Sequence, residues 1–167
     1  YGFNVGSAFT FDHIAMISFV NTVIGASAGA FGWLIFEYIL KKTTSLLGLL
    51  SGALSGLVAI TPAAGYVSYM SAMIIAIIGG ICCYIVINLI KVKLQYNDAL
   101  DAFGIHGVGG ILGAVLTGVF QSHQINSAVQ NGFIYTADFK VVVIQLGAAI
   151  ATVVFSAIVT FLDRKST

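Results

Sequence analysis

Long stretches without a charged side chain constrain this chain more than any other feature of its sequence. Residues 13–36, 43–90 and 141–162 contain no Asp, Glu, Lys or Arg. Across the whole chain 8% of residues are charged and 59% are hydrophobic, whereas an average soluble domain carries roughly 25% charged residues. Such a chain cannot cover its surface with ionised groups, so we predict an all-α integral membrane protein, because helices satisfy their own backbone groups in lipid.

The lengths of these stretches predict the number of helices. One membrane crossing needs about 20 apolar residues, so residues 43–90 can hold two. The only proline, Pro62, divides them in the run TPAAGY, because proline interrupts a helix. The expected helices cover about 13–40, 44–61, 68–90, 101–120 and 141–162. Residues 1–10 are expected to end a further helix, so that residues 1–167 form a single transmembrane unit and a fragment of a longer chain.

Positive charges predict the orientation of these helices. When the helices alternate in direction, six of the seven basic residues fall on one side of the membrane: Lys41, Lys42, Lys91, Lys93, Arg164 and Lys165. Lys140 lies on the opposite side, with the polar segment 121–139. Because cytoplasmic loops carry an excess of Lys and Arg, we expect a multi-pass cell-membrane protein with a cytoplasmic C-terminus.

A stripe of small residues surrounds one histidine in the expected helix over 101–120. Four residues follow one another at intervals of four and so share a face of an α-helix: Ala102, His106, Gly110 and Ala114. An ionisable side chain within a span usually faces the bundle interior or a water-filled path. We interpret His106 as part of the wall of a narrow path for something small. A structural histidine bonded to a neighbouring helix is the alternative.

Signatures of other function classes are missing from the sequence. It contains no HExxH or P-loop pattern, each of which would indicate a specific chemistry, so we expect neither an enzyme nor a cofactor. The three histidines lie in different segments without a carboxylate cluster, so no metal site is expected. Cys82 and Cys83 are interpreted as small packing residues. No basic cluster indicates nucleic-acid binding.

Four stretches resemble the second half of the ammonium transporter (Amt/Mep/Rh) family. They are GFNVGSAF (2–9), FVNT (19–22), SLLGLLSGALSGLVAITPAAGYV (45–67) and DAFGIHGVGGILGAVLTGVF (101–120). The two longer stretches are ordered and correctly spaced, and the resemblance extends over essentially the whole chain up to its last helix. The chain is therefore similar to the part of that family that runs from the end of the sixth helix through the eleventh.

The resemblance implies a fold and a function. The family fold has eleven helices, of which the first ten form two inverted repeats, a common transporter arrangement, and three protomers assemble with one pore each. Its members recruit ammonium externally, remove a proton and pass ammonia through a hydrophobic pore. The implied partners are ammonium or methylammonium, the lipid bilayer, further copies in a homotrimer, and a cytoplasmic regulator of the PII type.

Four residues acquire expected roles from the resemblance. His106 resembles the second of two pore histidines, which in the family share a hydrogen bond midway along the pore. Phe3 resembles a phenylalanine of the external gate, and Ser7 resembles the hydroxyl of the external recruitment site. Asp101 resembles the aspartate that opens the helix carrying the second histidine, and we expect it to support that helix. The first pore histidine and the rest of the recruitment site belong to the first repeat.

Two alternatives to transport stay open at this point. A protein of the same fold can act as an ammonium sensor or a nonconducting membrane binding protein. An unrelated channel for another small neutral solute would require the TPAAG and FGIHGVGG matches to be coincidental.

Overall fold

The computed structural model describes residues 1–95 and 97–166, and this part of the chain is helical without strands. The α-helices are α1 (His13–Lys41), α2 (Leu46–Ile60), α3 (Tyr69–Ile85), α4 (Lys91–Leu94), α5 (Val108–Phe120), α6 (Phe133–Thr136) and α7 (Lys140–Ser166). A short 3₁₀ helix, η1 (Gly6–Ala8), precedes them, and two π-helical turns, η2 (Val86–Ile90) and η3 (Phe103–Gly107), lie before α4 and α5. Residues 1–10, expected as the end of a helix, thus contain a single short helical turn.

Four helical segments of the described chain are long and apolar enough to cross a membrane: His13–Lys41, Tyr69–Leu94, Phe103–Phe120 and Lys140–Arg164. The chain is therefore a polytopic all-α membrane protein. The apolar helix α2 has 15 residues, which gives it a length of about 22 Å at 1.5 Å per residue. The hydrocarbon core is about 30 Å thick, so α2 alone is shorter than a full crossing. The turns of residues 61–67 follow directly after its last residue.

Side-chain caps set where the helices α1, α2 and α3 begin. The Asp12 carboxylate accepts a hydrogen bond from Ala15 N at 3.0 Å, and Ser45 Oγ accepts one from Gly48 N at 2.9 Å. Ser68 caps α3 in the same way. Such caps satisfy backbone donors that have no partner within the helix. The sequence therefore fixes three helix starts with short polar side chains that stand just before apolar runs.

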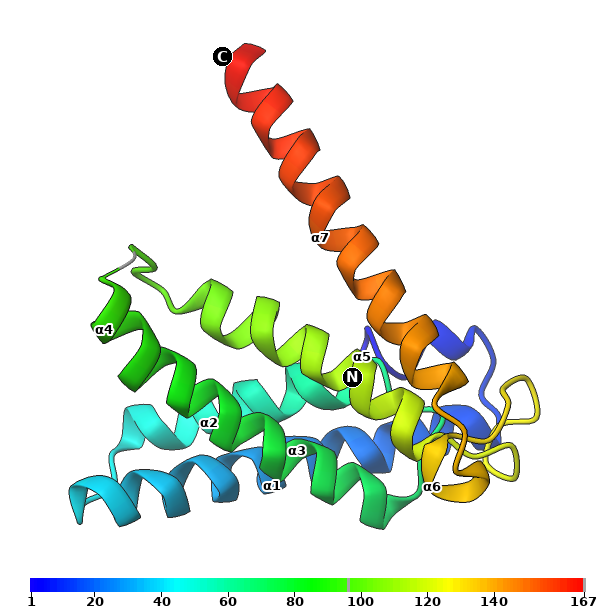
Figure 1. Cartoon of the computed structure of the whole chain (residues 1–167). Coiled ribbons are helices and arrows are strands. Elements are labelled where there is room, and N and C mark those ends of the chain that lie inside the picture. Colours follow the sequence, from blue (N-terminus) through cyan, green and yellow to red (C-terminus); the bar gives the residue numbers. More distant parts are fainter. Residues whose placement is uncertain (96, 167) are drawn as a thin grey trace.

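Helices α1, α2 and α3 run side by side in alternating directions (Figure 1). Their contact depends on glycines, because small residues let helix backbones approach in lipid. A Cβ added to Gly29 would overlap Gly56 Cα and lie 2.6 Å from the Gly52 carbonyl oxygen. The four-residue spacing of glycines in α1 and α2 therefore produces backbone contact between these helices.

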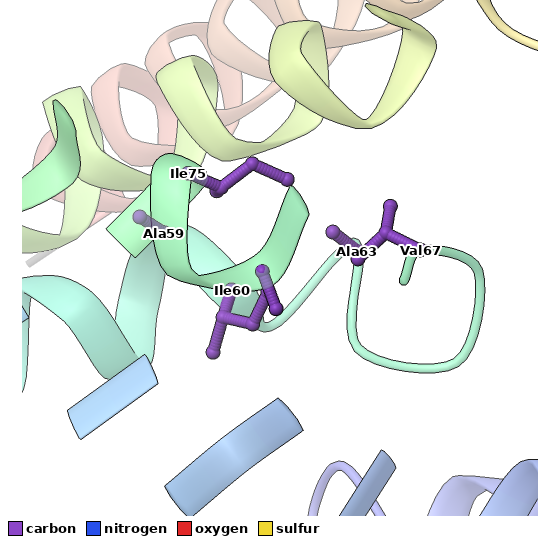
Figure 2. Packing of buried hydrophobic residues seen from close by; sticks show 6 residues of the cluster. Ala59, Ile60, Ala63, Val67 and Ile75 are labelled. Carbon is purple, nitrogen blue, oxygen red and sulfur yellow. The ribbon is translucent and has the colours of Figure 1, made fainter. Parts of the chain in front are cut away.

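A buried cluster of aliphatic side chains lies at the end of this bundle where the chain turns from α2 to α3. Figure 2 shows its aliphatic side chains, which are 0% exposed: Ala59, Ile60, Ala63, Val67, Ala72 and Ile75. Asn21 of α1 anchors the turn beside this cluster, since its Nδ2 donates to the carbonyl oxygens of Ala64 at 2.8 Å and Val67 at 2.9 Å. The turn after Pro62 is thus held by hydrogen bonds from α1 and by the burial of its aliphatic side chains.

The last two spans differ in how much neighbouring structure covers them. Helix α5 packs on α2 and α3, where a Cβ on Gly113 would overlap the Ala59 carbonyl oxygen and one on Gly109 would lie 3.3 Å from Cys83 Sγ. Helix α7 starts against α5 and then leaves the bundle (Figure 1). None of the residues in the most apolar 18-residue window of α7 is buried. An apolar helix with this exposure needs lipid or another polypeptide around it.

Candidate functional site

A groove between α5 and α7 contains the histidine that the sequence singles out. Its volume is about 380 Å³, and most of its wall is small or apolar. The lining residues are His106, Gly107, Gly110, Ile111 and Ala114 on one side, and Gln145, Ala148, Ala149, Thr152 and Val153 of α7 on the other. The absence of large side chains at Gly110 and Ala114 keeps the groove open beside the imidazole.

His106 lies in the π-helical turn η3, one residue before its end. Its side chain is exposed, and in the described part of the chain no hydrogen bond reaches the ring. A neutral imidazole offers one donor and one acceptor. Both ring nitrogens of His106 are therefore available to a molecule in the groove or to a side chain from another polypeptide.

The π-helical turn changes the stripe that the α-helical period predicts. His106, Gly110 and Ala114 line the groove, as the four-residue spacing predicts, but Ala102 does not. A π-helical turn bonds residues five positions apart and so contains one residue more than an α-helical turn. Because η3 begins directly after Ala102, that residue is out of register with the other three.

Phe3 and Ser7 come together in a second hollow, which does not include His106. This hollow has a volume of about 290 Å³ and lies between the N-terminal residues, α1 and the turn after α2. Its lining residues are Phe3, Asn4, Ser7, Ala8, Ile14, Ser18, Thr61, Pro62, Ala64, Gly65 and Tyr66. The Phe3 side chain is 74% exposed, and Ser7 Oγ donates to the Phe3 carbonyl oxygen at 2.6 Å.

Polar residues that the sequence analysis did not single out also line this second hollow. Asn4 Nδ2 donates to Thr22 Oγ1 at 3.1 Å, which ties the N-terminal residues to α1. Thr61 Oγ1 donates to the Leu57 carbonyl oxygen at 2.7 Å. A signal for both was present, since each is a polar residue within a stretch that carries the family resemblance, GFNVGSAF or ITPAAG.

Asp101 lies where the chain enters η3 and forms an ion pair. Its Oδ1 is 2.6 Å from Lys91 Nζ, and its backbone φ of 54° lies in the left-handed region. The sequence leads us to expect that Asp101 supports the helix that carries His106. In the structure the carboxylate that reaches the first backbone N–H groups of this segment is that of Asp98, whose Oδ2 accepts from Phe103 N at 3.0 Å and Gly104 N at 3.2 Å.

Comparison with known proteins agrees with this architecture. The sequence model of the Ammonium Transporter Family matches residues 1–165. The chain belongs to the ammonium transporter family. The ammonium transporter of Bacillus subtilis (strain 168) is 49% identical over 165 residues, which is 99% of this chain and 41% of that protein.

Solved structures show the same fold. The crystal structure of Saccharomyces cerevisiae Mep2 superposes with a TM-score of 0.86 at 32% identity, over 98% of this chain and 40% of that chain. A structure described as a sensor Amt protein superposes with a TM-score of 0.81 at 27% identity, over 99% of this chain and 40% of that chain. The chain spans about two fifths of the length of these relatives.

Proposed function

We propose that the chain forms part of a transmembrane path for ammonium and ammonia, with His106 in its wall. Membership of the ammonium transporter family supports the substrate. The observation that carries the role of His106 is its exposed imidazole in a groove of small, apolar residues. Such a groove suits a neutral solute the size of ammonia, because a charged one would lose hydration without compensation.

The hollow at Phe3 and Ser7 is the proposed place of ammonium recruitment. A phenyl face attracts a cation, and a serine oxygen can accept one of the four N–H bonds of ammonium. Loss of one proton from ammonium leaves ammonia, which is the species able to pass an apolar groove. The released proton goes to the external solution or to the acceptor nitrogen of a neutral imidazole.

Two further features belong to the proposal. The basic residues at the ends of α1 and α4 support a cytoplasmic position for that side of the bundle and for the C-terminus. The exposed apolar surface of the described helices supports assembly with lipid and with further copies in a proposed homotrimer. A PII-type cytoplasmic regulator is a further proposed partner, which rests on the family resemblance alone.

An ammonium sensor of the same fold is the second candidate. The structure described as a sensor Amt protein, with its TM-score of 0.81, favours retaining it. A sensor binds ammonium and changes a partner's activity, whereas a transporter must move substrate across the membrane. Measured uptake therefore separates the two candidates.

The test replaces His106 in a chimera in which residues 1–165 take the place of the matching segment of the Bacillus subtilis transporter. The parent chimera should support methylammonium uptake in cells that lack their own ammonium transporters. We expect His106→Ala to lower uptake at least tenfold without reducing the amount of folded protein, and His106→Glu to retain part of it with altered proton coupling, since a carboxylate can also bond across the groove. Unchanged uptake and current in His106→Ala would make this histidine structural.

A further inference from the structure

Two π-helical turns of the chain pack against each other. Ile87 of η2 is 9% exposed and contacts η3, where a Cβ added to Gly104 would lie 2.5 Å from Ile87 Cγ1. Ile105 joins the same buried cluster as Ile87. π-Helical turns are rare and occur frequently at functional sites. Here the second of the two turns carries His106.

A set of polar contacts holds the entry to this second turn. Lys91, which follows η2 directly, has its Nζ 2.6 Å from Asp101 Oδ1 and also donates to the Asp98 carbonyl oxygen. Asp98 Oδ2 in turn accepts from the backbone N–H groups of Phe103 and Gly104. The Lys91 and Asp101 side chains are 24% and 34% exposed, so this pair is shielded from water more than an ordinary surface ion pair.

These contacts bear on where the segment that carries His106 lies. Successive residues of an α-helix are rotated by about 100°, and a π-helical turn adds one residue to the count. If η3 relaxed to an α-helical turn, Gly104 and Ile105 would rotate relative to Ile87, and the segment that carries His106 would lose its packing on η2. Asp101 has a left-handed conformation, which aspartate adopts more readily than most residues other than glycine, and its ion pair with Lys91 holds the chain at the entry to η3.

The geometry points to Lys91 and Asp98 as positioning residues that keep the π-helical turn η3 in place and thereby hold the segment that carries His106 beside the groove. This inference rests on the proposed function, since it assigns the two residues to the path that His106 lines. Lys91 acts through the Asp101 carboxylate and the Asp98 carbonyl. Asp98 acts through the backbone of Phe103 and Gly104. Neither side chain lines the groove itself.

The first experiment measures methylammonium uptake by the chimera against substrate concentration. We expect Lys91→Met and Asp98→Ala each to lower the maximal rate at least fivefold and to change the half-saturating concentration less than twofold, because the recruitment hollow contains neither residue. Lys91→Arg, which keeps the positive charge, should recover at least half of the maximal rate. Lys93→Met removes an exposed lysine two positions further on and should leave both parameters unchanged.

The second experiment is independent of transport. Amide hydrogen exchange of the purified chimera should rise at least tenfold over residues 102–107 in Lys91→Met, stay at the parent level in Lys93→Met, and remain unchanged over residues 46–60 in both. Unaltered exchange at 102–107, or a rise of equal size throughout the chain, would overturn the inference. A parent chimera without uptake would contradict the proposed function, and the exchange result would still decide the role of Lys91.

Discussion

At the residue scale, the chain places its few polar side chains where they determine local structure. Glu37 is an example, because it is 5% exposed and accepts hydrogen bonds from Ser45 N and Ser45 Oγ, both at 3.2 Å. Lys41 Nζ lies 3.6 Å from the same carboxylate. A buried carboxylate needs such partners. One side chain thus joins the end of α1 to the cap of α2.

Asp12 gives a pH-dependent prediction at this scale. The hydrogen bond from Ala15 N, followed by that from the Thr10 hydroxyl, holds the pKa of Asp12 below its ordinary value of 3.8. A carboxylate whose pKa is lower in the folded state stabilises that state above the unfolded pKa, and the contribution is lost as the pH falls through the folded pKa. Asp12→Ala should therefore be less stable than the parent near neutral pH.

This difference should shrink as the pH falls below 3.8. The measurement is the midpoint of SDS-induced unfolding in mixed micelles at a series of pH values, for the parent, Asp12→Ala and Asp12→Asn. The asparagine variant keeps an acceptor without a titrating group, so its stability relative to Asp12→Ala should not change over the same range. A difference between parent and Asp12→Ala that stays constant at acidic pH would contradict the role of the carboxylate.

At the element scale, uncharged stretches and caps predict much of the helical pattern, because a helix in lipid needs an apolar run and its ends need polar partners. The stretches expected over 13–40 and 68–90 correspond to α1 and to the continuous span Tyr69–Leu94. What apolar periodicity does not predict is the pair of π-helical turns. They depend on contacts such as Ile87 with Gly104, which join residues far apart in sequence.

The candidate site was predictable to a similar degree. His106 stands out as an ionisable group in an apolar run, and its groove contains two of the three small residues expected beside it, Gly110 and Ala114 but not Ala102. The capping role of Asp98 was not predicted, because its carboxylate reaches Phe103 and Gly104 only after the chain folds back through residues 98–101. Spacing along the sequence does not report such a turn.

The glycine contact between α1 and α2 gives a prediction about packing. Gly29→Ala should destabilise the folded bundle by about 1–3 kcal/mol, the range for overpacking a tight contact, because the added methyl group overlaps Gly56 Cα. Gly147→Ala is the matched control, since nothing lies within 4 Å of a Cβ at that position. Its stability should be unchanged or slightly higher, because alanine favours helix more than glycine does.

The measurement is the free energy of unfolding by SDS titration for the parent and both variants. Equal stability of Gly29→Ala and the parent would mean that α1 and α2 can move apart to admit the methyl group without lowering the free energy of unfolding. That result would contradict the importance of the close approach of their backbones.

At the scale of the whole molecule, the bundle has two chemically different ends. The C-terminal ends of α1 and α4 lie at one end and α6 lies at the other (Figure 1). The first end carries Lys41, Lys42, Lys91 and Lys93. The other carries a polar segment whose His123 Nδ1 lies 2.9 Å from the Val129 carbonyl oxygen. This separation matches the charge asymmetry from which the orientation was predicted.

Cysteine labelling tests that orientation. In a chimera whose native cysteines, including Cys82 and Cys83, are replaced, single cysteines at the exposed positions Lys42 and Ser127 are treated with an impermeant maleimide in intact cells. We expect labelling at Ser127→Cys and protection at Lys42→Cys, with both labelled after the cells are opened. Labelling of intact cells at position 42 alone would reverse the proposed topology.

The last prediction concerns residues 1–167 expressed alone, which should not transport. The groove at His106 is lined by residues of η3, α5 and α7, and the imidazole meets no partner in the described part of the chain. A polar group that is buried among apolar neighbours without a hydrogen-bond partner is unfavourable by about 1–3 kcal/mol. The exposed length of α7 adds a surface that lipid alone must cover.

We expect the isolated 167 residues to aggregate or to remain silent in cells that lack their own ammonium transporters. Co-expression with the first part of the Bacillus subtilis transporter, up to the point where the match begins, should restore measurable methylammonium uptake, because it supplies the missing wall and a partner for His106. Robust growth on low ammonium with residues 1–167 alone would contradict this prediction. It would instead indicate an oligomer that builds a closed path from identical copies.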